Sequence, residues 1–259
     1  MVCVLFFRMG SCALVDYGFI RIRRRGSRPL HLKFFPYALE PPYAENRTMT
    51  KHSQATAYLA RKDPVLKGII KKAGQLRLER DTKRSIFEAL IRAIAHQQLH
   101  GRAARRILTR FLALFPKSGK FPKPNAVLRI PARKLRAVGF SHAKVKAIRD
   151  IASKAEHGLV PSIQKAKLMT DAEVIQALLP LRGVGRWTAE MILIFTLGRA
   201  DVLPVDDFGI REGFRIAYKK RVQPKPKALA KFGKRWAPYR SIAGLYLWRV
   251  ADQYKKVTF

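Results

Sequence analysis

The sequence predicts an all-α protein. Apolar residues recur at helical spacing, as in Ile86, Leu90 and Ile94, and two segments open with an S/T-x-x-E capping box, at Ser85 and Thr170. No run alternates polar and apolar residues for long enough to predict a sheet, and the sequence has no internal repeat. With 259 residues, 48% of them apolar, the chain can fill one core or two small lobes around a cleft.

Start and stop signals divide this helical sequence. A basic helix near 64–73 is expected between Asp63 and the Gly74 region, and another runs from about Gly101 until Pro116 stops it. Further helices are expected at 124–130, 131–138, 142–157, 171–179, 187–197, 207–218 and 239–254. A basic loop broken by prolines, 219–227, separates the last two.

The chain is strongly basic. It has 53 Lys plus Arg against 17 Asp plus Glu, a formal charge of +36. Self-repulsion of this size is tolerated chiefly when a polyanion neutralises it, so nucleic acid is the expected partner. A surface that is merely solubilising and attraction to anionic lipid are the alternatives. No stretch of 18 uncharged apolar residues occurs, so we expect no membrane span.

The sequence offers few side chains that could bind a metal ion. The two cysteines, Cys3 and Cys12, cannot build a disulfide framework or a four-cysteine metal or iron–sulfur site. His96 and His100 would share one helix face, but no Glu and no third ligand lies near them in the sequence. We therefore expect no metal site made of side chains.

Residues 1–48 differ from the rest of the chain. An apolar start is followed by an arginine cluster at 21–28 and a proline-rich run at 35–43. A transit peptide is one interpretation; we favour a basic extension that is disordered or not part of the native protein, with the helical region at 49–259. That region alone has 45 basic and 14 acidic side chains, a formal charge of +31.

The most specific local pattern joins two predicted helices at 179–189. Gly183 and Gly185 flank Val184, so the backbone can turn tightly there and approach another molecule closely. The amides that open the following helix would hold one DNA phosphate. The same tripeptide fits an ordinary packed hairpin of two helices, but its place in a basic chain, upstream of Asp207, favours DNA binding.

Several strings resemble the helix-hairpin-helix DNA glycosylases of the 3-methyladenine DNA glycosylase II type. They are LRGVGRWTAEM at 181–191, VLPVDDFGI at 202–210, RWAPYRSIAGLYLW at 235–248 and IAHQQLHGRAA at 94–104. The similarity covers about 85–252. It implies two helical lobes around a cleft, with a core lobe of about 85–200 and the helices of 49–84 and 201–259 packed around the cleft. It also implies no iron–sulfur cluster, because the four carboxy-terminal cysteines of that branch are missing.

The resemblance makes Asp207 the catalytic carboxylate and Asp206 a capping or supporting carboxylate, although from the residues alone either could be only an N-cap. Breaking the bond between a base and deoxyribose builds positive charge on the sugar, which a fixed carboxylate stabilises. The same group can orient or deprotonate the attacking water.

The resemblance places Trp187, Met191 and Trp248 around the extruded base, although both tryptophans could instead be core residues. An indole face would favour the positive charge of an alkylated purine by about 0.5 to 2 kcal/mol. Bifunctional relatives have a lysine where this chain has Trp187, so the resemblance implies base removal without strand cleavage.

Three kinds of DNA contact are expected. The hairpin contacts are Gly183, Val184, Gly185, Arg186 and Thr188. The Gln97–Leu99 turn matches the family's wedge, with Gln98 or Leu99 filling the gap left by the extruded base. Arg102, followed by Arg105 and Arg106, would grip phosphates, unless this is only a solvated charged face.

Together these features predict a monofunctional glycosylase that removes alkylated (3-methyl or 7-methyl) purines in base excision repair and leaves an abasic site. The alternatives are a glycosylase for oxidised or deaminated bases and a non-enzymatic DNA-binding protein. We expect a monomer acting on damaged double-stranded DNA, in the cytoplasm (nucleoid) of a prokaryote or in the nucleus or an organelle of a eukaryote. No cofactor is expected to be required, and the resemblance implies only a structural Na⁺ or K⁺ on the backbone carbonyls of Leu179, Leu181 and Val184.

Overall fold

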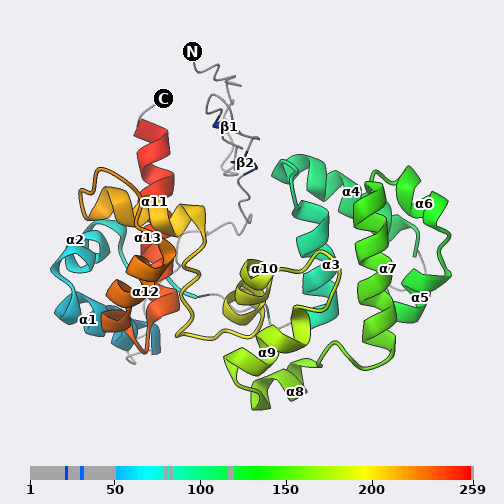
Figure 1. Ribbon diagram of the computed structural model, residues 1–259, viewed down its shortest axis with the longest axis horizontal. Coiled ribbons are helices and arrows are strands. Elements are labelled where there is room, and N and C mark those ends of the chain that lie inside the picture. Colours follow the sequence, from blue (N-terminus) through cyan, green and yellow to red (C-terminus); the bar gives the residue numbers. More distant parts are fainter. Residues whose placement is uncertain are drawn as a thin grey trace.

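The computed structural model describes residues 21–22, 30–31, 51–78, 81, 84–115 and 120–257 (Figure 1). About two thirds of them are helical and the only described strands are two residues long each, which confirms the predicted fold class. The extension expected at 1–48 lies outside the described residues, apart from a short antiparallel pair of strands, β1 (Arg21–Ile22) and β2 (Leu30–His31). No helix among the described residues is long and apolar enough to cross a membrane.

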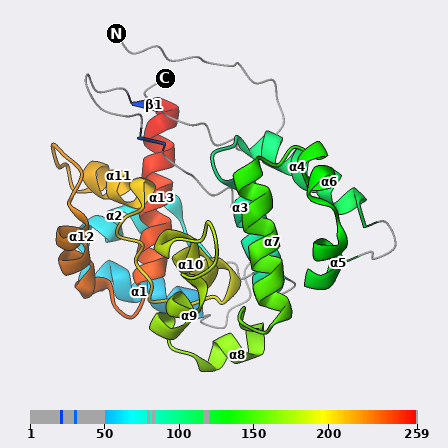
Figure 2. The ribbon, with the colours of Figure 1, turned by 45° about the vertical axis from the view of Figure 1, so that its right-hand side comes forward.

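The helices are arranged in two lobes (Figures 1 and 2). Their bounds in chain order are α1 (Lys51–Lys62), α2 (Pro64–Ala73), α3 (Ile86–His96), α4 (Gly101–Ala113), α5 (Pro124–Arg129), α6 (Ala132–Ala137), α7 (His142–Glu156), α8 (Ile163–Leu168), α9 (Asp171–Leu178), α10 (Arg186–Met191), the π-helix η1 (Ile192–Thr196), α11 (Phe208–Ala217), α12 (Pro226–Gly233), the 3₁₀ helix η2 (Lys234–Trp236) and α13 (Arg240–Val257).

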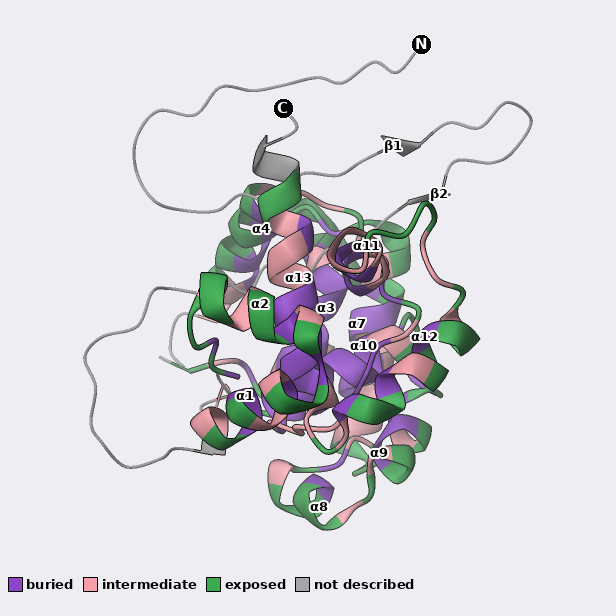
Figure 3. Ribbon diagram, turned by 90° about the vertical axis from the view of Figure 1, so that its left-hand side faces the viewer, coloured by how far each residue is buried: buried purple, intermediate pink, exposed green. Residues whose placement is uncertain are grey.

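One lobe is built around α3 and α7, which pack side by side with α4 and α5 against them. The other is built around α13, which contacts α11, α2 and α1. Between the lobes, α10 packs on α9 and its continuation η1 packs on α3. Buried residues line the inner helices, whereas α8 at the edge is largely exposed (Figure 3). The segment α10–η1 therefore joins the two halves of a continuous core.

The observed helices differ from the predicted ones where a proline was taken as part of a loop or where the apolar periodicity is weak. The α2 helix covers the predicted 64–73. The loop expected at 219–227 ends early, because Pro226 is the first residue of α12, where a missing amide costs no helical hydrogen bond. Nothing in the sequence analysis anticipates α1, α8 or α12. These helices are short or largely polar, and packing against the core stabilises them.

The two predicted capping boxes form to different extents. At Thr170 the hydroxyl accepts from the Glu173 amide at 3.2 Å, and the Glu173 carboxylate accepts from the Thr170 amide at 2.6 Å. At Ser85 the hydroxyl accepts from the Glu88 amide at 3.1 Å, but the Glu88 carboxylate accepts from Arg92 Nε at 2.8 Å. Ser85 thus caps α3, while Glu88 takes a charged partner one turn further along.

Asp63 links the first two helices to the carboxy-terminal part of the chain. It is buried and caps α2, and its Oδ1 accepts from the amides of Val65 at 3.0 Å and Leu66 at 3.3 Å. Its Oδ2 accepts from the Tyr218 hydroxyl and, at 2.9 Å, from Trp236 Nε1. Burial and the Asp63 carboxylate raise the pKa of Tyr218, so the phenol stays protonated as a donor.

Two glycines let α11 and α13 approach closely. Gly209 and Gly213 lie four residues apart on one face of α11. A Cβ on Gly213 would overlap the carbonyl of Leu247, and one on Gly209 would lie 2.8 Å from Trp248 Cδ1. Gly213 is therefore required because the backbone of α13 occupies the space beside it, and at Gly209 a Cβ would collide with the Trp248 indole.

Asp63→Asn should destabilise the protein by about 2 to 4 kcal/mol. The substituted amide keeps an acceptor for the cap but turns an NH₂ toward the Tyr218 hydroxyl and the Trp236 indole, which both donate. Urea unfolding measures the change. The exposed Glu156→Gln variant serves as control and should stay within about 0.5 kcal/mol of the wild type; equal stability of both variants would contradict the role of Asp63.

Gly213→Ala should destabilise by about 3 kcal/mol, because a methyl group forces α11 away from the α13 backbone. Gly68→Ala is the matched control, since Gly68 lies in α2 and a Cβ there meets nothing within 4 Å. That control should stabilise by about 0.5 to 1 kcal/mol through its helix propensity. Thermal or urea unfolding of the two variants measures both changes in stability. If both variants changed stability in the same direction, the close crossing of α11 and α13 would be contradicted.

Candidate active site

Asp207 lies at the junction of three segments. It is the N-cap of α11, its side chain is only 4% exposed, and its Oδ1 accepts from the Ile210 amide at 2.7 Å. Trp248 of α13 donates from Nε1 to the same oxygen at 2.7 Å, and Trp187 of α10 donates from Nε1 to Oδ2 at 2.8 Å. The carboxylate is thereby held in one orientation by donors from α10, α11 and α13.

The structure gives the capping role to Asp207 and not to Asp206. Asp206 is exposed, whereas the Asp207 carboxylate accepts the first-turn amide of α11. The capping alternative for Asp206 is therefore wrong, because the helix begins one residue later than that alternative requires. Asp207 combines both interpretations considered for the pair: it is a helix cap and also a buried carboxylate with two indole partners.

Burial dominates the electrostatics of Asp207. Removal from water raises the pKa of this carboxyl, and hydrogen bonds from Ile210, Trp187, Trp248 and Gly209 oppose the rise because they favour the ionised form. A carboxylate that is both dehydrated and fixed interacts strongly with a nearby positive charge, since little solvent screens it. The arrangement suits a group that stabilises developing positive charge.

The three predicted pocket residues lie along α10 and α13. Trp187 and Trp248 are half-buried, and the Trp248 ring stacks on Phe195 with centroids 5.8 Å apart. Met191, one turn after Trp187, is 2% exposed and lies in the core. Sequence reasoning named both tryptophans but gave no sign that their N–H groups point at Asp207.

The hairpin between α9 and α10 adopts the predicted tight turn. Gly183 has a φ of +78°, and a Cβ there would lie 3.1 Å from Ile94 Cδ1. Gly185 caps α10 and has open space where a side chain would be. The side chains of Val184 and Thr188 are buried, so these two residues can reach a ligand only through backbone groups.

Other elements hold the hairpin in place. Gln97 Nε2 donates to the Gly183 carbonyl at 2.9 Å, Asp150 accepts from the Arg182 amide at 2.8 Å, and Lys154 donates to the Pro180 carbonyl at 2.9 Å. Asp150 and Lys154 are one turn apart on α7 and also pair with each other. Sequence reasoning missed these supports, because they lie 26 to 86 residues from their partners.

The turn after α3 distinguishes the two wedge candidates. Gln98 is exposed at a φ of +58°, an uncommon conformation for a residue with a side chain. Leu99 is half-buried and packs against the core. Lys144 Nζ donates to the Ala95 carbonyl at 2.7 Å and satisfies the end of α3. Gln98 is therefore the residue that projects from this turn.

Glu190 is a buried carboxyl on the same helix as Trp187. It is 3% exposed, its Oε1 accepts from Arg186 Nε at 3.0 Å, and its Oε2 has no hydrogen-bond partner among the described residues. Burial raises the pKa of Glu190 to about 7, and the negative charges of Asp206 and Asp207 add to the rise, while Arg186 opposes it. The sequence gave no signal for this second perturbed carboxyl.

Among the described residues, no group of three His, Cys, Asp or Glu side chains could hold a metal ion. The hairpin also presents backbone carbonyls, an oxygen ligand that suits hard cations. The Leu181 carbonyl accepts from the Val184 amide at 3.0 Å, which leaves its second lone pair for a cation.

The chain is similar to known DNA glycosylases in sequence and in structure. The chain is 37% identical over 213 residues to DNA-3-methyladenine glycosylase 1 of Schizosaccharomyces pombe, spanning 81% of this chain and 93% of that protein. The structure is similar to that of the 3-methyladenine DNA glycosylase of the same yeast in complex with abasic DNA, with a TM-score of 0.69 at 37% identity over 76% of this chain and 95% of that chain. A DNA-3-methyladenine glycosidase of Bacillus halodurans gives a TM-score of 0.71 at 33% identity over 80% of this chain and 92% of that one.

The family comparison agrees with these likenesses and confirms the resemblance inferred from the motifs. Residues 91–238, which contain the wedge turn, the hairpin and Asp207, match the profile of HhH-GPD superfamily base excision DNA repair proteins. The chain therefore belongs to the HhH-GPD superfamily of base excision DNA repair proteins.

Proposed function

We propose that this chain is a monofunctional DNA glycosylase that hydrolyses the N-glycosidic bond of 3-methyl and 7-methyl purines in duplex DNA and leaves an abasic site. The observation that carries the proposal is the Asp207 carboxylate, buried and fixed by two indole N–H groups beside the hairpin helix. The names of the relatives, DNA-3-methyladenine glycosylases with 37% identity in one case, support the same substrate class.

The geometry accounts for the chemistry of bond cleavage. As the base departs, positive charge develops on the deoxyribose, and the ionised Asp207 stabilises it without reorganising. The same carboxylate can orient a water molecule for attack on the sugar. Its low exposure limits solvent around the reacting atoms, which strengthens the electrostatic effect.

Two features restrict the reaction to base removal on electron-poor purines. Trp187 stands where bifunctional relatives carry a lysine, so no amine is present at that position to form a Schiff base. The indole faces of Trp187 and Trp248 favour a cationic methylpurine over a neutral base. The N-glycosidic bond of such a base is also easier to cleave, because the base departs as a neutral molecule.

We propose that the partner is double-stranded DNA bound by a monomer through the hairpin and the wedge turn. The amides of a helix's first turn point along the helix axis and suit a phosphate, and the open space at Gly185 would allow close approach to the start of α10. Gln98 projects from the wedge turn and would fill the gap in the stacked bases, with Arg102 close behind it on α4. A Na⁺ or K⁺ on the carbonyls of Leu179, Leu181 and Val184 would stiffen the hairpin.

Asp207→Asn should lower base release from methylated DNA by roughly 10²- to 10⁴-fold while the affinity for duplex DNA changes little. The substitution removes the negative charge and keeps an oxygen that can cap α11, while its NH₂ group replaces the oxygen that accepts from the Trp187 indole. Single-turnover release of free bases, identified by chromatography, measures the loss, and circular dichroism checks the fold. Asp206→Asn should retain most of the activity, because Asp206 is exposed; the opposite ranking would transfer the catalytic role to Asp206.

Base release should fall as the pH is lowered, and at a higher pH than for an exposed aspartate. Burial raises the pKa of Asp207, and protonation removes the charge that stabilises the sugar. A profile of the single-turnover rate against pH measures the inflection. Glu190→Gln is the control, because burial brings the pKa of Glu190 to about 7: the inflection should persist in that variant, and its disappearance would assign the pH dependence to Glu190.

A further inference from the structure

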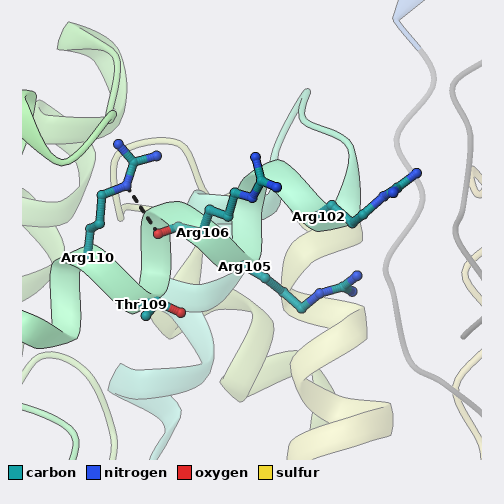
Figure 4. A pocket seen from close by; sticks show the side chains of 5 residues that line it. All are labelled: Arg102, Arg105, Arg106, Thr109 and Arg110. Carbon is teal, nitrogen blue, oxygen red and sulfur yellow. Dashed lines mark hydrogen bonds between the residues drawn. The ribbon is translucent and has the colours of Figure 1, made fainter.

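The exposed side of α4 carries a row of arginines. Together with one threonine they recur at helical spacing and line an open hollow of about 510 Å³: Arg102, Arg105, Arg106, Thr109 and Arg110. In Figure 4 the arginine side chains extend away from the helix, and Arg110 Nε donates to the Arg106 carbonyl at 3.4 Å. The opposite side of α4 is apolar and buried, with Phe111 deepest in the core. The orientation of the arginines is thus fixed by the core packing of the helix.

The charge pattern of α4 works against the helix itself. Arg102, Arg106 and Arg110 follow each other at intervals of four residues, a spacing at which like charges repel. The first turn of α4 contains no acidic residue and the remaining turns contain none either, so the positive end of the helix dipole is left uncompensated within the helix. A bound polyanion would offset both effects. The preference for arginine over lysine fits phosphate, which the guanidinium can bind with two parallel hydrogen bonds.

The position of α4 brings this side next to the DNA expected at the wedge turn. Gln97 contacts the hairpin, Gln98 forms the tip of the turn, and α4 begins at Gly101. Five residues separate Arg105 from Arg110, which is about 7.5 Å along a helix axis. Successive phosphates of one strand advance by about 3.4 Å along the duplex axis. The row of arginines is therefore long enough to follow about three phosphates.

The positive charge of Arg105 also acts on His96, the last residue of α3. The pKa of His96 is lowered to about 4, first by burial and then by the positive charge of Arg105, with contributions from Lys144, Arg92 and Arg84. His96 directly precedes the wedge turn. An approaching phosphate backbone would meet the positive charges of these side chains at this point.

We propose that Arg105, Arg106 and Arg110, with the Thr109 hydroxyl, form a second phosphate-binding surface that holds two or three backbone phosphates beside the extruded nucleotide, separately from the hairpin. The inference rests on the proposed function, because it takes the wedge turn as the point where DNA is entered. This surface provides affinity and orientation of the duplex and takes no part in cleaving the glycosidic bond. A free polyphosphate has the same phosphate chemistry as a DNA strand, but its phosphates are not spaced as they are along a duplex.

The test compares two triple variants that remove the same charge. Arg105→Gln/Arg106→Gln/Arg110→Gln changes the proposed surface, and Lys67→Gln/Lys71→Gln/Lys72→Gln changes exposed lysines of α2 in the other lobe. Dissociation constants for a duplex with a stable abasic-site analogue are measured at several salt concentrations. The slope of log K against log salt should fall by about 2 to 3 in the arginine variant, at about 0.9 per phosphate, and stay unchanged in the lysine variant. Equal slopes in the two variants would overturn the proposal.

Chemically neutralised phosphates locate the contact. Methylphosphonates are placed in either strand on one side of the lesion, and the arginine variant should lose no further affinity where the neutralised phosphates are its partners. If the losses of affinity caused by the methylphosphonates and by the arginine variant add fully on both strands, the proposal is overturned. It is also overturned if the arginine variant loses affinity for inorganic tripolyphosphate but not for the duplex. If the triple variant does not fold, Arg106→Gln and Arg110→Gln singly should each lower the slope by about 0.9.

Single-turnover base release at saturating protein separates this proposal from the proposed function. The arginine variant should release methylated bases at the wild-type rate once bound. Absence of base release by the wild-type protein would refute the glycosylase assignment, while the slopes would still decide whether the α4 surface binds phosphates.

Discussion

The close crossing of α11 and α13 determines the geometry of the candidate site. Gly209 and Gly213 lack the side chains that would separate the two helices; the α13 backbone at Leu247 occupies the space at Gly213, and the Trp248 side chain lies against Gly209. The Asp207 carboxylate at the start of α11 thereby comes within hydrogen-bond distance of Trp248, while Trp187 reaches it from the opposite side. Because α10 continues through η1 into contact with α3, the same core that joins the two lobes also fixes the position of the carboxylate.

A second constraint concerns the hairpin, whose conformation is not left to its own sequence. Gln97 comes from the end of α3 and Asp150 and Lys154 come from α7, so two helices of one lobe fix the carbonyls and amides of a short turn. A phosphate site made of backbone amides works only if those amides already point at the ligand, since ordering them on binding costs conformational entropy. Part of this lobe therefore serves as a rigid mount for the hairpin.

Much of the fold could be predicted from the sequence, because helical periodicity, capping residues and glycines act locally. The α2 and α9 boundaries and the hairpin turn were accessible in this way, whereas the family resemblance singled out Asp207, Trp187 and Trp248. The rest depends on contacts between distant residues. Neither the indole hydrogen bonds to Asp207 nor the burial of Glu190 has a local signature, and the residues alone did not show which of the neighbours Asp206 and Asp207 caps the helix. The Gly209-x-x-x-Gly213 spacing was a usable signal for the helix crossing that the sequence analysis did not exploit.

The double role of Asp207 places stability and activity in opposition. A buried carboxyl whose pKa is raised on folding favours the folded state most in its protonated form, below the ordinary pKa of an aspartate, and this contribution is lost as the pH rises through the raised value. The ionised form that would support glycosidic cleavage is therefore the form that strains the native state. A more thermostable descendant could arise by neutralising this one position, and it would keep the architecture while losing repair, so selection for function must continually retain a less stable protein.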